Sequence, residues 1–159
     1  MRGDALGRWT PVFARLLQIV TGRGGERNKP PRSAVVGAWG EARAAAFLKA
    51  SGYAVIGQNV RPDRHDEIDL VVRRGDTLVF VEVKTRRRED FGRPLSAVNP
   101  RKRHALNRAA AAYVRKAGYP QLFFRFDVIE VLGQPEEGEP LIRHIENAFP
   151  FEQRLRFSR

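Results

Sequence analysis

The chain has 159 residues, enough for one compact domain with a hydrophobic core and some additional tail. It contains no cysteine, which excludes disulfides, thiolate zinc sites and cysteine nucleophiles. Its three histidines are too scattered for a histidine-rich motif, so any metal would be held mainly by oxygen ligands. The formal net charge of +11 favours a polyanionic partner, with nucleic acid ahead of an acidic membrane surface.

The sequence predicts no association with a membrane and a cytoplasmic location. No apolar run approaches the ~20 residues that a membrane-spanning helix needs. The stretch "RWTPVFARLLQIV" is a poor signal peptide, because Arg15 interrupts its apolar part and no small-residue cleavage site follows it.

Residues 1–33 differ from the rest, with seven Arg or Lys against two acids and the linker-like stretch "TGRGGERNKPPR". Val12 to Val20 could form one short amphipathic helix. We predict a flexible basic arm; a misassigned start codon and a simple solubilising tail are the alternatives. The domain itself is expected at 34–150, with a basic C-terminal tail at 151–159.

The domain is predicted to open with an Ala-rich helix from Ser33, its N-cap, to about Ser51, with Gly52 ending it. "YAVIGQNV" reads as a strand. The next stretch, "EIDLVVRRGDTLVFVEVKTR", reads as a hairpin with the two-residue turn Gly75-Asp76.

Counting back from that turn pairs Arg74 with Thr77 and sets Asp69 opposite Glu82. The two carboxylates then share one face of the hairpin with Lys84, two residues further along. A slip of one residue would put the two acids on opposite faces.

The second half of the chain contains a basic loop, a helix from Pro100 to about Ala117, a strand at 122–132, an acidic turn and a last strand at 141–149. The predicted order is α-β-β-β-α-β-β. This order indicates an α/β fold with a mixed sheet of about five strands flanked by helices.

The buried acids of the hairpin are candidates for a metal site. Two adjacent carboxylates repel each other, and a divalent cation removes that repulsion. Glu41 lies on the helix face that should meet the sheet, so a third acid can point towards the hairpin. Three acids and Lys84 around Mg²⁺ or Mn²⁺, in a basic domain, suit phosphodiester hydrolysis. The alternative is structural: Asp69 or Glu82 paired with Lys84, and Glu41 exposed.

An Asp followed by Glu-x-Lys across a hairpin resembles the PD-(D/E)xK motif of restriction-endonuclease-like nucleases. The wider pattern resembles the YraN-type family of bacterial proteins, through "GEARAAAFLKASGYAVIGQNVR", "EIDLVV", "FVEVKTR", "FGRPLSAVNPRKRHALNRAAAAYV", "RFDVIEV" and "HIENAF". The resemblance to this family covers about residues 40–149. Such proteins are similar in fold to archaeal Holliday-junction resolvases.

The resemblance implies a restriction-endonuclease-like fold in which Glu41, Asp69 and Glu82 are metal-site acids and Lys84 is the catalytic lysine. By analogy with junction resolution, which needs two cuts, it also implies a homodimer. Asp66 stands where the family usually has Gly, and it adds a potential fourth acid. Glu67 is a weaker ligand candidate.

Basic residues flank the proposed site and are candidates for gripping phosphates. They are Arg86, Arg87, Arg88, Arg93, Arg101, Lys102 and Arg103. Lys102, at the start of a helix near the active face, is our choice for a substrate phosphate contact. Solvated surface is the alternative for the others.

Three functions follow from this reading. The first is a metal-dependent endonuclease acting on branched or structured DNA. The second is a nucleic-acid-binding module of the same fold with weak or no cleavage. The third is a basic adaptor that binds a protein partner. The sequence leaves open whether the nucleic acid is DNA or RNA.

Overall fold

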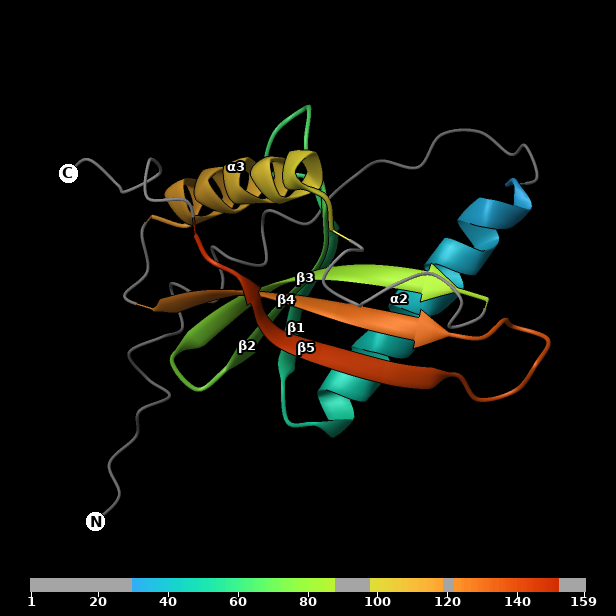
Figure 1. The fold of residues 1–159 in the computed structure, drawn as a ribbon. Helices are drawn as coiled ribbons and strands as arrows, with labels where there is room; N and C mark the ends of the chain where they lie inside the picture. Colours follow the sequence, from blue (N-terminus) through green and yellow to red (C-terminus); the bar gives the residue numbers. More distant parts are fainter. Residues whose placement is uncertain (1–29, 88–97, 119–121, 152–159) are drawn as a thin grey trace, which may run out of the picture.

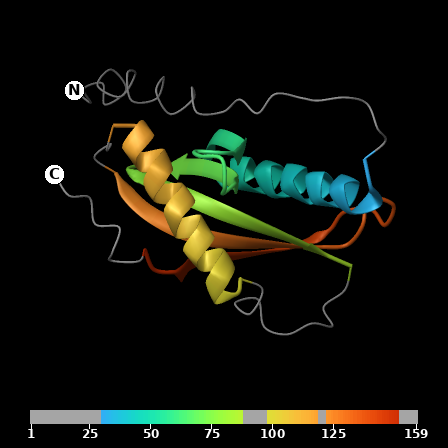
Figure 2. The same ribbon diagram turned by 90° about the horizontal axis from the view of Figure 1, so that it is seen from above.

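The structure, a computed structural model, describes residues 30–87, 98–118 and 122–151. In these ranges one mixed sheet of five strands has a helix on each face (Figure 1, Figure 2). The elements are α2 (Arg32–Ala50), β1 (Ala54–Val60), β2 (Ile68–Arg74), β3 (Thr77–Arg86), α3 (Pro100–Lys116), β4 (Phe123–Leu132) and β5 (Leu141–Phe149). This confirms the predicted fold class and element order, and it is consistent with a restriction-endonuclease-like fold.

The strands follow the order β1-β2-β3-β4-β5 across the sheet. All neighbouring pairs are antiparallel except β3 and β4, which run parallel from Thr77↔Phe123 to Arg86↔Leu132. A parallel pair needs a long crossover, and the segment containing α3 supplies it.

The β2–β3 hairpin has the predicted register. Arg74 pairs with Thr77 and Val72 with Val79, which leaves Gly75 and Asp76 as a two-residue turn. Gly75 has a φ of 61°, a left-handed conformation that glycine adopts without steric cost. The turn therefore determines which side chains of β2 and β3 share a face.

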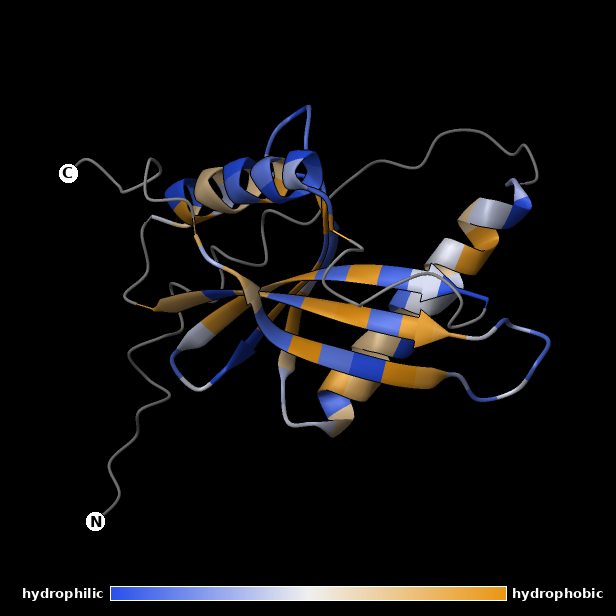
Figure 3. Ribbon diagram, viewed as in Figure 1, coloured by the Kyte–Doolittle hydropathy of each residue, from blue (hydrophilic) through white to orange (hydrophobic). Residues whose placement is uncertain are grey.

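Each face of the sheet carries its own hydrophobic core, because alternate residues of a strand point to opposite faces. On the α3 side, Phe80 packs edge-on against Tyr113 with ring centroids 5.7 Å apart, and Phe126 lies beside it. On the α2 side, Leu48 packs with Val79 and other strand residues. Figure 3 shows hydrophobic residues along the strands and hydrophilic residues on the visible side of α3.

Glycines end both helices as expected, but the predicted N-cap of the first helix is wrong. Gly52, just after the first helix, has a φ of 85°. Its N–H donates a hydrogen bond to the carbonyl of Lys49, and the N–H of Tyr53 donates one to the carbonyl of Leu48. This pair of bonds is a Schellman motif. Helix α2 begins at Arg32 with Pro31 as N-cap and no side-chain capping bond. Because the N-cap lies two residues earlier than predicted, Ser33 lies inside the first turn of the helix.

Several predictions lie outside the described residues: the Val12 to Val20 helix, Arg88, Arg93 and nearly all of the C-terminal tail. Phe151, at the start of that tail, packs against Phe126 with ring centroids 4.7 Å apart. Among the helices of the described ranges, none has the length and apolar character to cross a membrane.

Candidate functional site

The candidate site lies where β2 and β3 separate. The ladder between them ends at Leu70↔Val81; beyond it β2 stays with β1, while β3 stays with β4 as far as Arg86. Asp69 spans the gap, because its Oδ2 accepts a hydrogen bond of 2.7 Å from the backbone N–H of Val83. The ladder between β2 and β3 therefore ends at the position of the predicted acids.

Glu82 is the buried centre of the site, with its side chain only 3% exposed. Its Oε1 accepts a hydrogen bond of 2.6 Å from Lys84 Nζ, and its Oε2 lies 3.1 Å from Lys102 Nζ. Lys102 forms an ion pair with this oxygen, and the pair raises the pKa of the lysine. Apart from this ion pair, Glu82 Oε2 has no hydrogen-bond partner among the described residues.

Lys102 reaches Glu82 because of how α3 begins. Asn99 caps the helix by accepting a hydrogen bond of 2.9 Å from the backbone N–H of Lys102, and Pro100 occupies the first helical position. Burial lowers the pKa of Lys102, but the carboxylates of Glu82 and Asp69 outweigh burial, so its pKa stands above the ordinary value. Two lysines from distant parts of the chain thus neutralise one buried acid.

Asp69 and Glu41 complete the acidic cluster. Burial, and then the charge of Glu82, raise the pKa of Asp69 to about 7. Burial also raises the pKa of Glu41, while a hydrogen bond to Asn59 opposes the rise. Asn59 has a left-handed φ of 50°, a strained conformation that Asn tolerates better than most residues. Three acids from α2, β2 and β3 therefore share one electrostatic environment.

The raised pKa of Asp69 predicts that stability falls as pH rises from about 4 to about 7. In that range the folded protein keeps a proton that the unfolded chain, with a pKa near 3.8, has lost. Folding is therefore favoured at the acidic end, and the advantage of up to about 4 kcal/mol is lost as pH passes through 7. Urea unfolding of the wild type and of Asp69→Asn at pH 5 and at pH 7.5 measures this change in the free energy of unfolding.

The slope of the free energy of unfolding against pH should be smaller in Asp69→Asn than in the wild type, because an asparagine at this position has no carboxyl group to titrate. Asp76→Asn, at the exposed hairpin turn, is the matched control and should keep the slope. Identical slopes in all three proteins would contradict an ionisable Asp69 held in a buried acidic cluster.

Comparison with known proteins identifies the family. Residues 40–131, more than half of the chain, match the uncharacterised protein family UPF0102. The chain belongs to the UPF0102 family. A UPF0102 protein of Symbiobacterium thermophilum is 48% identical over 114 residues, which cover 72% of this chain and 95% of that protein. Another from Geobacter sulfurreducens is 42% identical over 128 residues, 80% of this chain and 94% of that one. UPF0102 is the YraN-type family that the sequence motifs predicted, so that prediction is confirmed.

In this UPF0102 protein the other nearby acids are directed away from Glu82. Asp66 accepts two hydrogen bonds from Arg108 of α3, 3.1 and 3.0 Å long. Glu67 pairs with Arg61 at 2.6 Å. Both carboxylates have cationic partners of their own, but the charge of Glu67 also raises the pKa of Glu41 and that of Lys102, so Glu67 lies at the edge of the acidic cluster.

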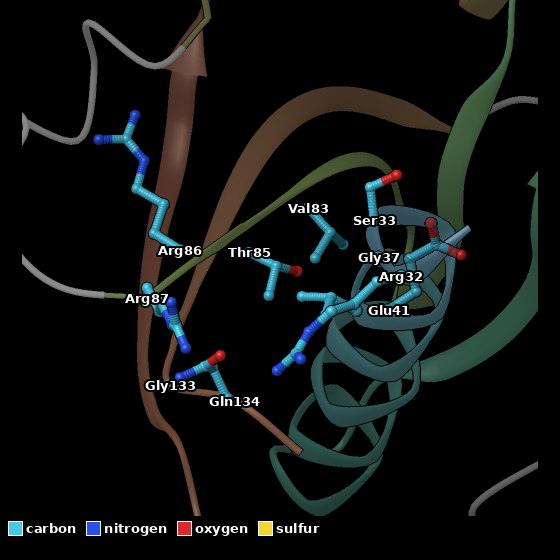
Figure 4. A pocket seen from close by; sticks show the side chains of 11 residues that line it. Arg32, Ser33, Gly37, Glu41, Val83, Thr85, Arg86, Arg87, Gly133 and Gln134 are labelled. Atoms are coloured by element: carbon cyan, nitrogen blue, oxygen red, sulfur yellow. The ribbon is translucent and has the colours of Figure 1, made fainter. Parts of the chain in front are cut away.

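The predicted phosphate-binding residues are spread over several places. Arg86 and Arg87 line a cavity beside Glu41 (Figure 4). Arg101 lines a separate hollow next to Arg108. Arg103 donates a hydrogen bond of 2.8 Å to the Val98 carbonyl and lies over the ring of Phe149. The basic run is therefore not one continuous surface.

A second buried polar network lies on the α2 face and was not predicted as a unit. Asp127, fully buried on β4, accepts two hydrogen bonds from Arg125, and His144 Nε2 lies 2.7 Å from its Oδ2. The backbone N–H of Asn147, a residue with a φ of 51°, bonds to its Oδ1. The only sequence signal was an acid inside the apolar run of "RFDVIEV", together with "HIEN" in the last strand.

Proposed function

We propose that this UPF0102 protein is a metal-dependent nuclease that hydrolyses phosphodiester bonds in DNA, with branched or structured DNA as the substrate class. The observation that carries the proposal is Glu82 Oε2, a buried carboxylate oxygen with no hydrogen bond. This oxygen faces the ammonium group of Lys102, 3.1 Å away on a side chain that is 34% exposed. A metal ion at the fork would take the place of that ammonium group beside the carboxylate.

The residues present fit Mg²⁺ or Mn²⁺. In residues 30–87, 98–118 and 122–151 no three His, Cys, Asp or Glu side chains form a ready metal cluster. Mg²⁺ does not need one, because it is commonly bound by one or two carboxylates, with waters and substrate phosphate oxygens completing its shell. Asp69 and Glu82 would hold the ion, with Glu41 beside them. When bound, the ion supplies an activated water and neutralises charge on the phosphate.

The two lysines supply the cationic part of the site. Lys84 and Lys102 are 30% and 34% exposed, so each ammonium group can move from Glu82 towards a phosphate that enters from solvent. Positive charge placed where negative charge develops lowers the barrier to hydrolysis. The raised pKa of Lys102 keeps it protonated for this role.

A second candidate function, nucleic-acid binding without cleavage, is favoured by one observation. Glu82 is already neutralised by two lysines of its own chain. If those ion pairs persist in the complex, no cation is required and the site is structural.

A cleavage assay decides between the two. The substrates are fluorescently labelled four-way junction, flap, duplex and single-stranded DNA, with a single-stranded RNA of matched sequence. We expect cleavage with Mg²⁺ or Mn²⁺ and none with EDTA. Salt-dependent binding of these substrates without cleavage in either metal would favour the second candidate.

Cleavage of a four-way junction also requires two cuts, so the proposal includes a homodimer on that substrate. Light scattering of the protein–junction complex measures the stoichiometry. A single chain for each junction would contradict this part of the proposal.

A further inference from the structure

A cavity of about 510 Å³ adjoins the candidate site. It lies between the first turns of α2 and the last residues of β3, and the segment that follows β4 borders it as well (Figure 4). Helix α2 comes so close to β3 here that a Cβ on Gly40 would clash with Thr85 Oγ1. Gly40 thus permits the close approach next to which the cavity opens.

The cavity is basic at one end and has Glu41 at the other. Val83 and Thr85 line it from the α2 face of β3, whereas Glu82 and Lys84 lie on the opposite face of the same strand, so Glu41 is the acid that the cavity shares with the candidate site. Figure 4 shows the side chains of Arg32 and Arg87 directed into the space between α2 and β3, while the side chain of Arg86 points away from Glu41. Three arginines and one acid are therefore among the lining residues. Arg32 also pairs with Glu136 at 3.2 Å, but both side chains are more than 60% exposed, and such a surface pair contributes little.

The lining suits a phosphodiester backbone. Guanidinium groups bind phosphate oxygens through paired hydrogen bonds, and the hydroxyl groups of Ser33 and Thr85 can donate to the same oxygens. The volume is within the range of small-molecule sites, which is about 300–1,000 Å³. Among the residues that the structure describes, the lining includes no aromatic side chain on which a base could stack, so recognition would concern the backbone rather than the base.

We propose that this cavity binds the sugar-phosphate backbone of the nucleic-acid strand immediately beside the bond cleaved at the fork. The strand runs from Glu41 towards Arg87, and the guanidinium groups of Arg87 and Arg32 hold a phosphate that is not cleaved. This inference rests on the proposed function and adds to it a subsite that sets the position of the cut strand.

Gly37 provides a test that leaves the fold intact. It lies in α2 and lines the cavity, and a Cβ added to it meets no atom within 4 Å. Gly37→Leu should therefore occupy the cavity without a clash, and leucine has the higher helix propensity of the two residues. Val35→Leu, on the same helix at a residue that is 47% exposed, is the matched control.

The measurement is fluorescence anisotropy of a labelled 15-nucleotide single-stranded DNA in EDTA, so that binding is separated from cleavage. We expect Gly37→Leu to weaken binding at least tenfold and Val35→Leu to leave it unchanged. The double variant Arg32→Gln with Arg87→Gln should weaken binding and flatten its dependence on salt. The stabilisation by Mg²⁺ in thermal melts should be retained in Gly37→Leu.

Two competitors, inorganic phosphate and a deoxynucleoside monophosphate, identify the source of the phosphate. Neither should displace the strand at millimolar concentration if the cavity holds a polymer backbone. Tight binding of the mononucleotide, lost in Gly37→Leu, would overturn the assignment to a strand. Equal binding of the 15-mer by wild type and Gly37→Leu would overturn the subsite, while metal-dependent cleavage by wild type would still support the proposed function. A wild type that binds no nucleic acid would overturn both.

Discussion

Replacing Glu82 with glutamine is expected to abolish metal-dependent cleavage, with a loss of roughly two to three orders of magnitude in rate. The amide removes the charge that holds the cation and changes little in size. It should also abolish the stabilisation that the metal gives the wild type, which is about 2.7 kcal/mol at a hundredfold excess over the dissociation constant. Cleavage assays and thermal melts, with Mg²⁺ and with EDTA, measure both effects.

The stability of the metal-free variant separates the two readings of Glu82. If Glu82 serves mainly as a ligand, the variant should lose less than the 3–5 kcal/mol typical of a broken buried ion pair. Lys84 and Lys102 can turn to solvent, and the repulsion that raises the pKa of Asp69 is relieved. Glu67→Gln, which removes a nearby acid already paired with Arg61, is the control and should stay active. A wild type indifferent to metal, together with a variant destabilised by 3–5 kcal/mol, would refute the nuclease proposal.

Asp127→Asn is expected to lower the free energy of unfolding by about 3–5 kcal/mol. The carboxylate is fully buried and holds Arg125 through hydrogen bonds of 2.8 and 2.9 Å, with His144 2.7 Å away. An asparagine leaves the guanidinium group without its counter-charge and presents an amide to partners that need an acceptor. The loss is a large part of the 5–15 kcal/mol that stabilises a typical domain, and urea unfolding measures it.

Glu146→Gln is the matched control for this network. Glu146 also contacts Arg125, at 3.2 Å, and accepts a hydrogen bond from the Tyr53 hydroxyl, but half of its side chain is exposed. We expect it to cost no more than about 1 kcal/mol. A loss in Asp127→Asn as small as that of the control would show that the network does not stabilise the domain.

The sequence alone determined the elements and the local geometry of the hairpin. The two-residue turn Gly75-Asp76 set the register of the hairpin, and the i, i+2 spacing put Glu82 and Lys84 on one face of β3. The ends of both helices followed from Gly52 and Gly118, since a left-handed residue ends a helix locally. These features depend on contacts between residues near one another in the chain.

Only the tertiary structure decided what surrounds the acids. The sequence could not show that β2 and β3 separate at Leu70↔Val81, because β1 and β4 compete for their edges. It predicted Lys102 as a phosphate contact, but the packing of α3 brings its ammonium group to Glu82. The cavity between α2 and β3 was likewise absent from the sequence pattern. Such contacts join residues far apart in the chain, and their geometry depends on how whole helices and strands pack rather than on any local spacing.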